Sequence, residues 1–115
     1  MNIKGIPVSG SRVCGLVELS IGAAKVVVFG TGARPFEMIV VRDESGVRGF
    51  VNECPHLPLP LNIGSRIYSV NEQLHCDHHY AVFRFSDGEC TSGVCVGQAL
   101  TSIALAVTGD DVTIE

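Results

Sequence analysis

The chain has 115 residues, of which 46% are hydrophobic and 17% charged, and its net charge is −4. This length and composition suit a single globular domain with its own core and exclude a disordered chain. The acidic balance argues against a nucleic-acid partner, because phosphate binding needs a basic face.

The first residues, MNIKGIPVSGSR, lack both the apolar core and the small-residue cleavage site of a signal peptide. No apolar run approaches the ~18 residues that a transmembrane helix needs. We therefore expect a cytoplasmic protein with no membrane partner. In that compartment the five cysteines should be reduced, buried or metal-bound rather than joined in disulfides.

Short β-branched segments separated by turn residues run through the first half of the chain. Residues 1–12 show no hydrophobic period and are expected to form a loose N-terminal arm, followed by one domain over residues 13–115. Asp43-Glu44-Ser45-Gly46 has the chemistry of a hairpin turn. The expected strands are residues 13–19, 24–29, 37–42 and 47–52.

The second half continues with short strands, interrupted by a proline-rich loop. Leu57-Pro58-Leu59-Pro60-Leu61 excludes both a helix interior and a central strand. Residues 90–97 are small and are expected to form a loop, and no segment holds a helical period. The pattern predicts an all-β fold, an antiparallel sandwich or barrel. The expected strands are residues 66–70, 73–76, 81–85, 100–107 and 111–114.

Two short segments combine cysteine with histidine: Cys54-Pro55-His56 and Cys76-Asp77-His78-His79. Thiolates and imidazoles grouped in this way indicate a metal site. Structural zinc turns usually pair cysteine with cysteine, whereas each segment here offers one cysteine and at least one histidine. This pattern favours a binuclear iron centre in which the cysteines bind one iron and the histidines the other. A zinc-stabilised binding module is the alternative.

The arrangement C-x-H followed at a distance by C-x-x-H resembles the signature of the Rieske 2Fe-2S family. The resemblance implies an antiparallel β-sandwich with a small cluster-binding subdomain of two loops, at about residues 52–85. It also implies a Rieske-type 2Fe-2S cluster bound by Cys54, His56, Cys76 and His79. The family pattern selects His79 over the adjacent His78, which is left as a loop residue.

The family resemblance extends past the ligands but includes departures. Residues 83–89 resemble the family's F-x-x-x-x-G-x turn, and residues 93–100 lie where the family places a third loop over the cluster. Asp77 stands where proline is usual and Tyr80 where glycine is usual. The third loop has Cys95, preceded by valine, in place of the proline that often packs on the cluster.

The positions that tune the cluster indicate a low potential. High-potential relatives carry a serine two residues and a tyrosine four residues after the second histidine ligand, and an extra cysteine in each cluster loop. Here those positions are Ala81 and Phe83, the first loop has no second cysteine, and position 77 is aspartate. The resemblance therefore implies a low-potential cluster of the ferredoxin type.

The function implied by the resemblance is that of a one-electron carrier, not an enzyme in its own right. Such carriers pass electrons from a flavoprotein reductase to a terminal oxygenase or similar oxidoreductase. A small Rieske subunit of a larger reductase, of the nitrite reductase type, is the alternative. Residues 57–59 are expected to form an apolar docking surface beside the cluster. Cys14 is expected to be buried, and Cys90 and Cys95 to be either packed thiols or a redox-sensitive pair.

Overall fold

The structure, a computed structural model, describes residues 5–30, 35–57, 59–64, 66–78 and 80–115. Over these ranges the chain is almost entirely β-structure, and every strand pair is antiparallel, as the sequence predicted. None of the helical structure in these ranges is long and apolar enough to cross a bilayer. The elements are β1 (Arg12–Gly15), η1 (Leu16–Glu18, a 3₁₀ helix), β2 (Ala24–Phe29), β3 (Phe36–Asp43), β4 (Gly46–Val51), β5 (Tyr68–Val70), β6 (Gln73–His75), β7 (Val82–Arg84), β8 (Cys90–Ser92), β9 (Ser102–Ile103), β10 (Leu105–Thr108) and β11 (Asp111–Ile114).

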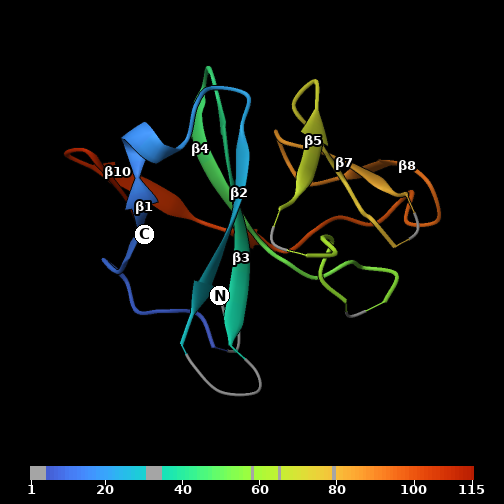
Figure 1. Cartoon of the computed structure of the whole chain (residues 1–115), viewed down its shortest axis with the longest axis horizontal. Coiled ribbons are helices and arrows are strands. Elements are labelled where there is room, and N and C mark those ends of the chain that lie inside the picture. Colours follow the sequence, from blue (N-terminus) through green and yellow to red (C-terminus); the bar gives the residue numbers. More distant parts are fainter. Residues whose placement is uncertain (1–4, 31–34, 58, 65, 79) are drawn as a thin grey trace.

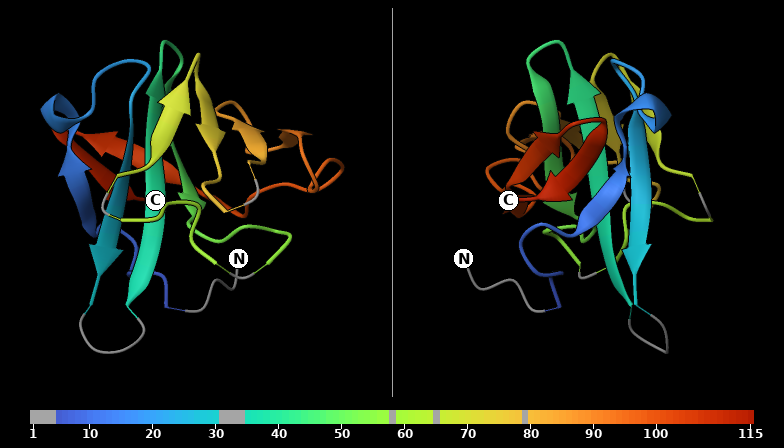
Figure 2. Two further views of the ribbon diagram at one scale, coloured as in Figure 1. Left: turned by 45° about the vertical axis from the view of Figure 1, so that its right-hand side comes forward. Right: turned by 90° about the vertical axis from the view of Figure 1, so that its left-hand side faces the viewer.

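The described strands form three sheets, with the orders β1-β11-β10, β2-β3-β4-β9 and β5-β6-β7-β8. In Figure 1 the sheet with β1 and β10 stands on the left, the sheet with β5, β7 and β8 on the right, and β2, β3 and β4 between them. The turned view on the left of Figure 2 keeps this order. The β2-β3-β4-β9 sheet therefore joins two parts of the molecule, each with its own core.

The middle of strand β3, residues 38–41, is buried on both faces, which explains its run of four apolar residues. Ile39 and Val41 belong to the core that also contains the buried residues of β6 and β7. Met38 and Val40 point the other way, into the core shared with β1 and β11. Successive side chains of a strand alternate between faces, so one strand can supply both cores.

Three expectations about single elements need correction. Residues 13–19 do not form one strand, because β1 ends at Gly15 and η1 follows. The expected loop at 90–97 begins with a strand, β8, that pairs with the edge of β7. The expected strand at 100–107 is divided into β9, which pairs with β4, and β10, which pairs with β11. In the last case β9 pairs with a strand from the first half of the chain, and this distant pairing overrides the local pattern.

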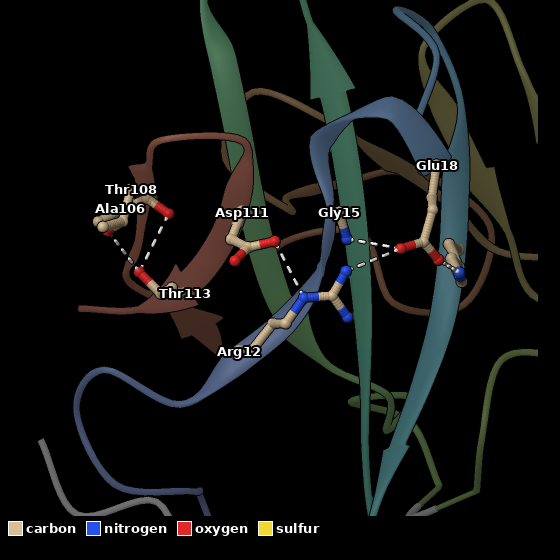
Figure 3. A network of polar contacts seen from close by, with 8 residues as sticks. Arg12, Gly15, Glu18, Ala106, Thr108, Asp111 and Thr113 are labelled. Carbon is tan, nitrogen blue, oxygen red and sulfur yellow. Dashed lines mark hydrogen bonds and ion pairs between the residues drawn. The ribbon is translucent and has the colours of Figure 1, made fainter.

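The junction between β1 and η1 is held by the exposed carboxylate of Glu18 (Figure 3). It accepts hydrogen bonds from Gly15 N at 2.7 Å and Lys25 Nζ at 2.8 Å. The hydrogen bond from Lys25, followed by that from the Gly15 backbone, lowers the pKa of Glu18 to about 2. Arg12 links the same carboxylate, at 3.2 Å, to Asp111 of β11, at 2.9 Å. These contacts end the strand where sequence alone predicted that it would continue.

Candidate metal centre

The two Cys/His segments form two loops closed in the same way. Cys54 follows the end of β4, and its N–H donates to the carbonyl of Leu59 at 2.9 Å. Cys76 follows the end of β6, and its N–H donates to the carbonyl of Ala81 at 2.8 Å. Each loop thus begins at a cysteine that is bonded to the residue five positions later. The two cysteines therefore occupy equivalent positions at the starts of their loops.

Both loop cysteines point into the protein. Cys54 is 3% exposed and Cys76 is 1% exposed, and both belong to the core between the β2-β3-β4-β9 and β5-β6-β7-β8 sheets. Phe83 and Leu61 are buried in the same core. A buried thiolate is excluded from water, which suits a metal ligand better than a surface nucleophile.

Asp77 ties the second loop to the end of the first. Its backbone N–H donates to the carbonyl of Leu61 at 2.7 Å, and its carboxylate accepts from Ile63 N at 2.9 Å. Proline, which the family usually has here, lacks the N–H for the first of these bonds. The departure at position 77 therefore supplies a link between the loops that proline cannot make.

Asn52 holds together the two ends of the first loop. It is buried, with 5% exposure, and its side-chain oxygen accepts from Leu61 N at 2.9 Å. Its side-chain amide donates to Asn62 Oδ1 at 2.7 Å. Sequence reasoning missed this residue, because asparagine after a strand is common in turns and the pattern carries no sign of burial.

A third loop touches both ligand-bearing loops. A Cβ placed on Gly93 would lie 2.9 Å from Cα of Ala81, so the third loop approaches the second at backbone distance. Cys95 is fully buried, and its Sγ lies 3.7 Å from Sγ of Cys54 in the first loop. The expected third loop thus packs where the resemblance placed it, with a thiol against a predicted ligand.

The other cysteines of the chain are free thiols. Cys14 is buried in β1, and burial raises its pKa. Cys90 donates to the carbonyl of Ser92 at 3.2 Å and forms no disulfide with Cys95. Burial, with the hydrogen bond and charge of Cys54 acting in the same direction, raises the pKa of Cys95 to about 11. At neutral pH the thiols of Cys14 and Cys95 are therefore protonated.

The histidines divide by exposure. His56 is exposed on the first loop, and His75 and His78 are half-buried. The ring of His75 packs edge-on against Tyr68, with centroids 5.1 Å apart. His79 lies outside the described residues. Among the described residues, no three His, Cys, Asp or Glu side chains gather around a single point.

The decisive comparison is with families of known domains. The Rieske [2Fe-2S] domain family matches residues 11–104. The chain belongs to this family. Its cofactor is accordingly a Rieske-type 2Fe-2S cluster. No curated protein matches the chain significantly.

Solved structures give this Rieske domain the same fold as known ferredoxins. The ferredoxin of carbazole 1,9a-dioxygenase from Nocardioides aromaticivorans IC177 matches with a TM-score of 0.69 and 23% identity, covering 93% of this chain and 97% of that one. The Sphingomonas yanoikuyae B1 ferredoxin matches with a TM-score of 0.69 and 17% identity, covering 92% and 97%. A structure of the complex of reduced oxygenase and oxidized ferredoxin in carbazole 1,9a-dioxygenase matches with a TM-score of 0.69 and 21% identity, covering 90% and 89%. At these identities the likeness establishes the fold.

The residues of the Rieske domain fit the cluster. Two buried thiols stand at equivalent positions of two linked loops, and thiolates are the usual protein ligands of iron–sulfur clusters. Each loop also carries histidine, the residue that replaces cysteine on one iron of a Rieske centre.

Proposed function

We propose that this chain is a one-electron carrier whose cluster is bound by Cys54, His56, Cys76 and His79, in a domain spanning residues 13–115 after an arm at 1–12. The observation that carries the proposal is the pair of equivalent loops, each beginning at a buried cysteine. Such a pair offers two thiolates for one iron and two imidazoles for the other.

The bound cluster takes up and releases one electron at a time. The protein residues divide the site into an inner and an outer side. Cys54 and Cys76 lie inside the core, where the packed side chains exclude water. His56 lies on the exposed side of its loop, so the electron would enter and leave through the histidine edge.

Apolar side chains on the three loops support a docking role. Leu57 and Leu59 are 39% and 41% exposed, and Ile63 is 64% exposed. Tyr80 on the second loop and Val94 on the third are 80% and 59% exposed. Exposed apolar residues concentrated near a redox site are typical of protein interaction surfaces. Leu57 and Leu59 are therefore assigned to the docking surface expected at residues 57–59, while Pro58 lies outside the described residues.

The partners follow from the class of carrier. A flavoprotein reductase would supply the electron and a terminal oxygenase or similar oxidoreductase would receive it. The structural likeness to ferredoxins of oxygenase systems supports this pair of partners and supports a carrier rather than an enzyme. Free thiols at all five cysteines support a reducing compartment, the cytoplasm.

The proposed potential is low within the Rieske range of roughly −150 to +300 mV. Ala81 and Phe83, at the positions where high-potential relatives carry hydroxyls, are both fully buried. Neither side chain can donate a hydrogen bond to a cluster sulfur, and such bonds raise the potential by stabilising the reduced state. A midpoint above about +100 mV, within that range, would contradict this proposal.

Iron and sulfide analysis with EPR of the anaerobically purified protein tests the ligand set. We expect two irons and two labile sulfides per chain and a rhombic EPR signal after reduction. Cys54→Ser and His79→Ala should abolish or strongly change this signal. Cys14→Ser removes a buried thiol from the other core and should leave it intact. A colourless protein with one bound zinc would refute the proposal.

Electron transfer tests the carrier role. The holoprotein, an NADH-dependent flavoprotein reductase and a Rieske terminal oxygenase are combined, and reduction and reoxidation of the cluster are followed by visible absorption. We expect complete reduction by the reductase and reoxidation by the oxygenase. A cluster that neither partner reduces nor oxidises would favour the alternative of a subunit within a larger reductase.

A further inference from the structure

One buried thiol outside the proposed ligand set contacts a thiol within it. Cys54 Sγ and Cys95 Sγ are 3.7 Å apart, within the range of a sulfur hydrogen bond, and the two residues are 3% and 0% exposed. They come from the first and third loops, 41 positions apart in the sequence. Neither the cysteine spacing nor the Rieske motif predicts this contact.

The direction of the hydrogen bond follows from the proposed ligand set. Between two free thiols, either sulfur can be the donor. A cysteine that binds iron does so as a thiolate and has no proton to donate. Once Cys54 is a ligand, the proton of the contact must therefore come from Cys95.

We propose that Cys95 donates an S–H···S hydrogen bond to the ligand Cys54 and thereby raises the reduction potential of the cluster. The inference rests on the ligand set of the proposed function. Reduction adds one negative charge to the cluster and its ligands, and a donor beside a ligand sulfur stabilises that charge. Cys95 is thus a tuning residue, which acts through Cys54 and does not bind iron itself.

The third loop holds Cys95 in place for this role. The Cys95 carbonyl accepts from Gln98 N at 2.8 Å, which closes the turn after it. Gly93, two residues before, packs against the second loop at a distance that leaves no room for a side chain. The backbone of His56 also forms a hydrogen bond with the Cys95 thiol, so this residue contacts the first loop at two points.

Cys90 provides a matched control. It is buried to the same degree as Cys54, at 2% exposure, and lies on β8, just before the third loop. Its thiol donates to the carbonyl of Ser92, at 3.2 Å, and not to a proposed ligand. Replacing Cys90 removes a buried thiol nearby without removing the proposed donor.

The test measures the midpoint potential of the holoprotein by EPR-monitored redox titration for the wild type, C95A, C95S and C90A. We expect C95A to shift the midpoint to lower potential and C90A to leave it unchanged. C95S, which keeps a donor, should lie between C95A and the wild type. A midpoint in C95A equal to that of the wild type would overturn the proposal, as would equal shifts in C95A and C90A.

A second measurement keeps the proposal testable if C95A does not fold. Resonance Raman spectra of the wild type and C95S are recorded in H₂O and D₂O. Exchange of the donated proton should shift the iron–thiolate stretching bands of the wild type, by a different amount in C95S. Identical isotope shifts in the two proteins would overturn the proposal. A wild type without a 2Fe-2S cluster would overturn the ligand set as well, whereas an unresponsive cluster would overturn only the role of Cys95.

Discussion

Tyr80 adopts a backbone conformation that tyrosine rarely takes. Its φ is +59°, in the left-handed region, at the position where the Rieske family usually has glycine. The second loop therefore keeps its turn despite the substitution, because the bond from Tyr80 N to the Cys76 carbonyl, at 2.9 Å, and the Cys76–Ala81 bond close it. Packing of the tyrosine ring adds little stability to offset this strain, since the residue is 80% exposed.

Tyr80→Gly should stabilise the protein by about 1 kcal/mol, because glycine adopts positive φ without steric cost. The measurement is the urea midpoint of the anaerobic holoprotein, followed by circular dichroism. Tyr68→Gly is the control, since Tyr68 is also exposed but lies in strand β5, where glycine should destabilise. A lower urea midpoint for Tyr80→Gly would mean that the ring makes a stabilising contact.

Gly88 is required both by its backbone and by its neighbours. Its φ is +74°, and a Cβ there would lie 2.7 Å from Cε1 of Phe50 in the core. It is the glycine of the F-x-x-x-x-G-x turn that the sequence showed at residues 83–89. The structure thus explains this element of the family pattern by close packing as well as by turn geometry.

Gly88→Ala should destabilise the protein by roughly 2–4 kcal/mol, from backbone strain together with overpacking against Phe50. Gly109→Ala separates the two causes, since Gly109 has φ +63° but no atom within 4 Å of the added Cβ. That control should lose only about 1 kcal/mol. Equal losses of unfolding free energy in the two variants, measured by urea denaturation, would show that the Phe50 side chain moves aside without destabilising the protein.

At the scale of elements, the second loop and β7 together carry the two positions on which the proposed low potential rests. Ala81 ends the loop and Phe83 lies in the middle of β7, both fully buried in the core that contains the two loop cysteines. Their burial beside the proposed ligands means that a hydroxyl introduced there would meet protein or cluster rather than bulk water.

The double variant Ala81→Ser with Phe83→Tyr should raise the midpoint potential, because each hydroxyl would offer a hydrogen bond to the cluster sulfurs. Redox titration of the holoprotein measures the change. Phe85→Tyr is the control, since Phe85 is equally buried in the same core but lies in the following turn. If the double variant titrates like the wild type, the loop holds these positions away from the sulfurs.

At the scale of the whole molecule, the three loops form one end with exposed apolar residues, distant from η1. The ligand loops adjoin the β5-β6-β7-β8 sheet, whereas η1 follows β1 on the opposite side of the central sheet (Figure 1). Val17 in η1 is 91% exposed, more than any apolar residue of the loops. It therefore offers a substitution of similar chemistry away from the proposed docking surface.

Leu57→Asp with Leu59→Asp should slow electron transfer to the terminal oxygenase about tenfold or more, because two charges would be buried on docking. Stopped-flow mixing of the reduced holoprotein with the oxygenase measures the rate. Val17→Asp should leave that rate unchanged. Equal rates in the wild type and the double variant would place the docking surface elsewhere on the molecule.

Local patterns were most reliable where a segment makes its structure with its immediate neighbours. β2 and β11 have the predicted bounds, and β3 lies within one residue of its prediction at each end. The β5–β6 turn at Asn71 and Glu72, both with positive φ, also lies where it was expected. Prediction failed at β8, a short strand that pairs with the preceding strand β7. It also failed at the division between β9 and β10, where the pairing of β9 with the distant strand β4 decides the structure.

The sequence by itself determined the all-β class, the family and the type of cofactor. The reason is that metal ligation requires particular residue types at particular spacings, and this pattern can be recognised in a single sequence. The tertiary structure alone decided how the loops are linked. Asp77 and Cys95 contact residues of other loops, and Asn52 joins the two ends of its own loop. Such contacts arise when the loops fold and pack against one another, and no local pattern encodes them.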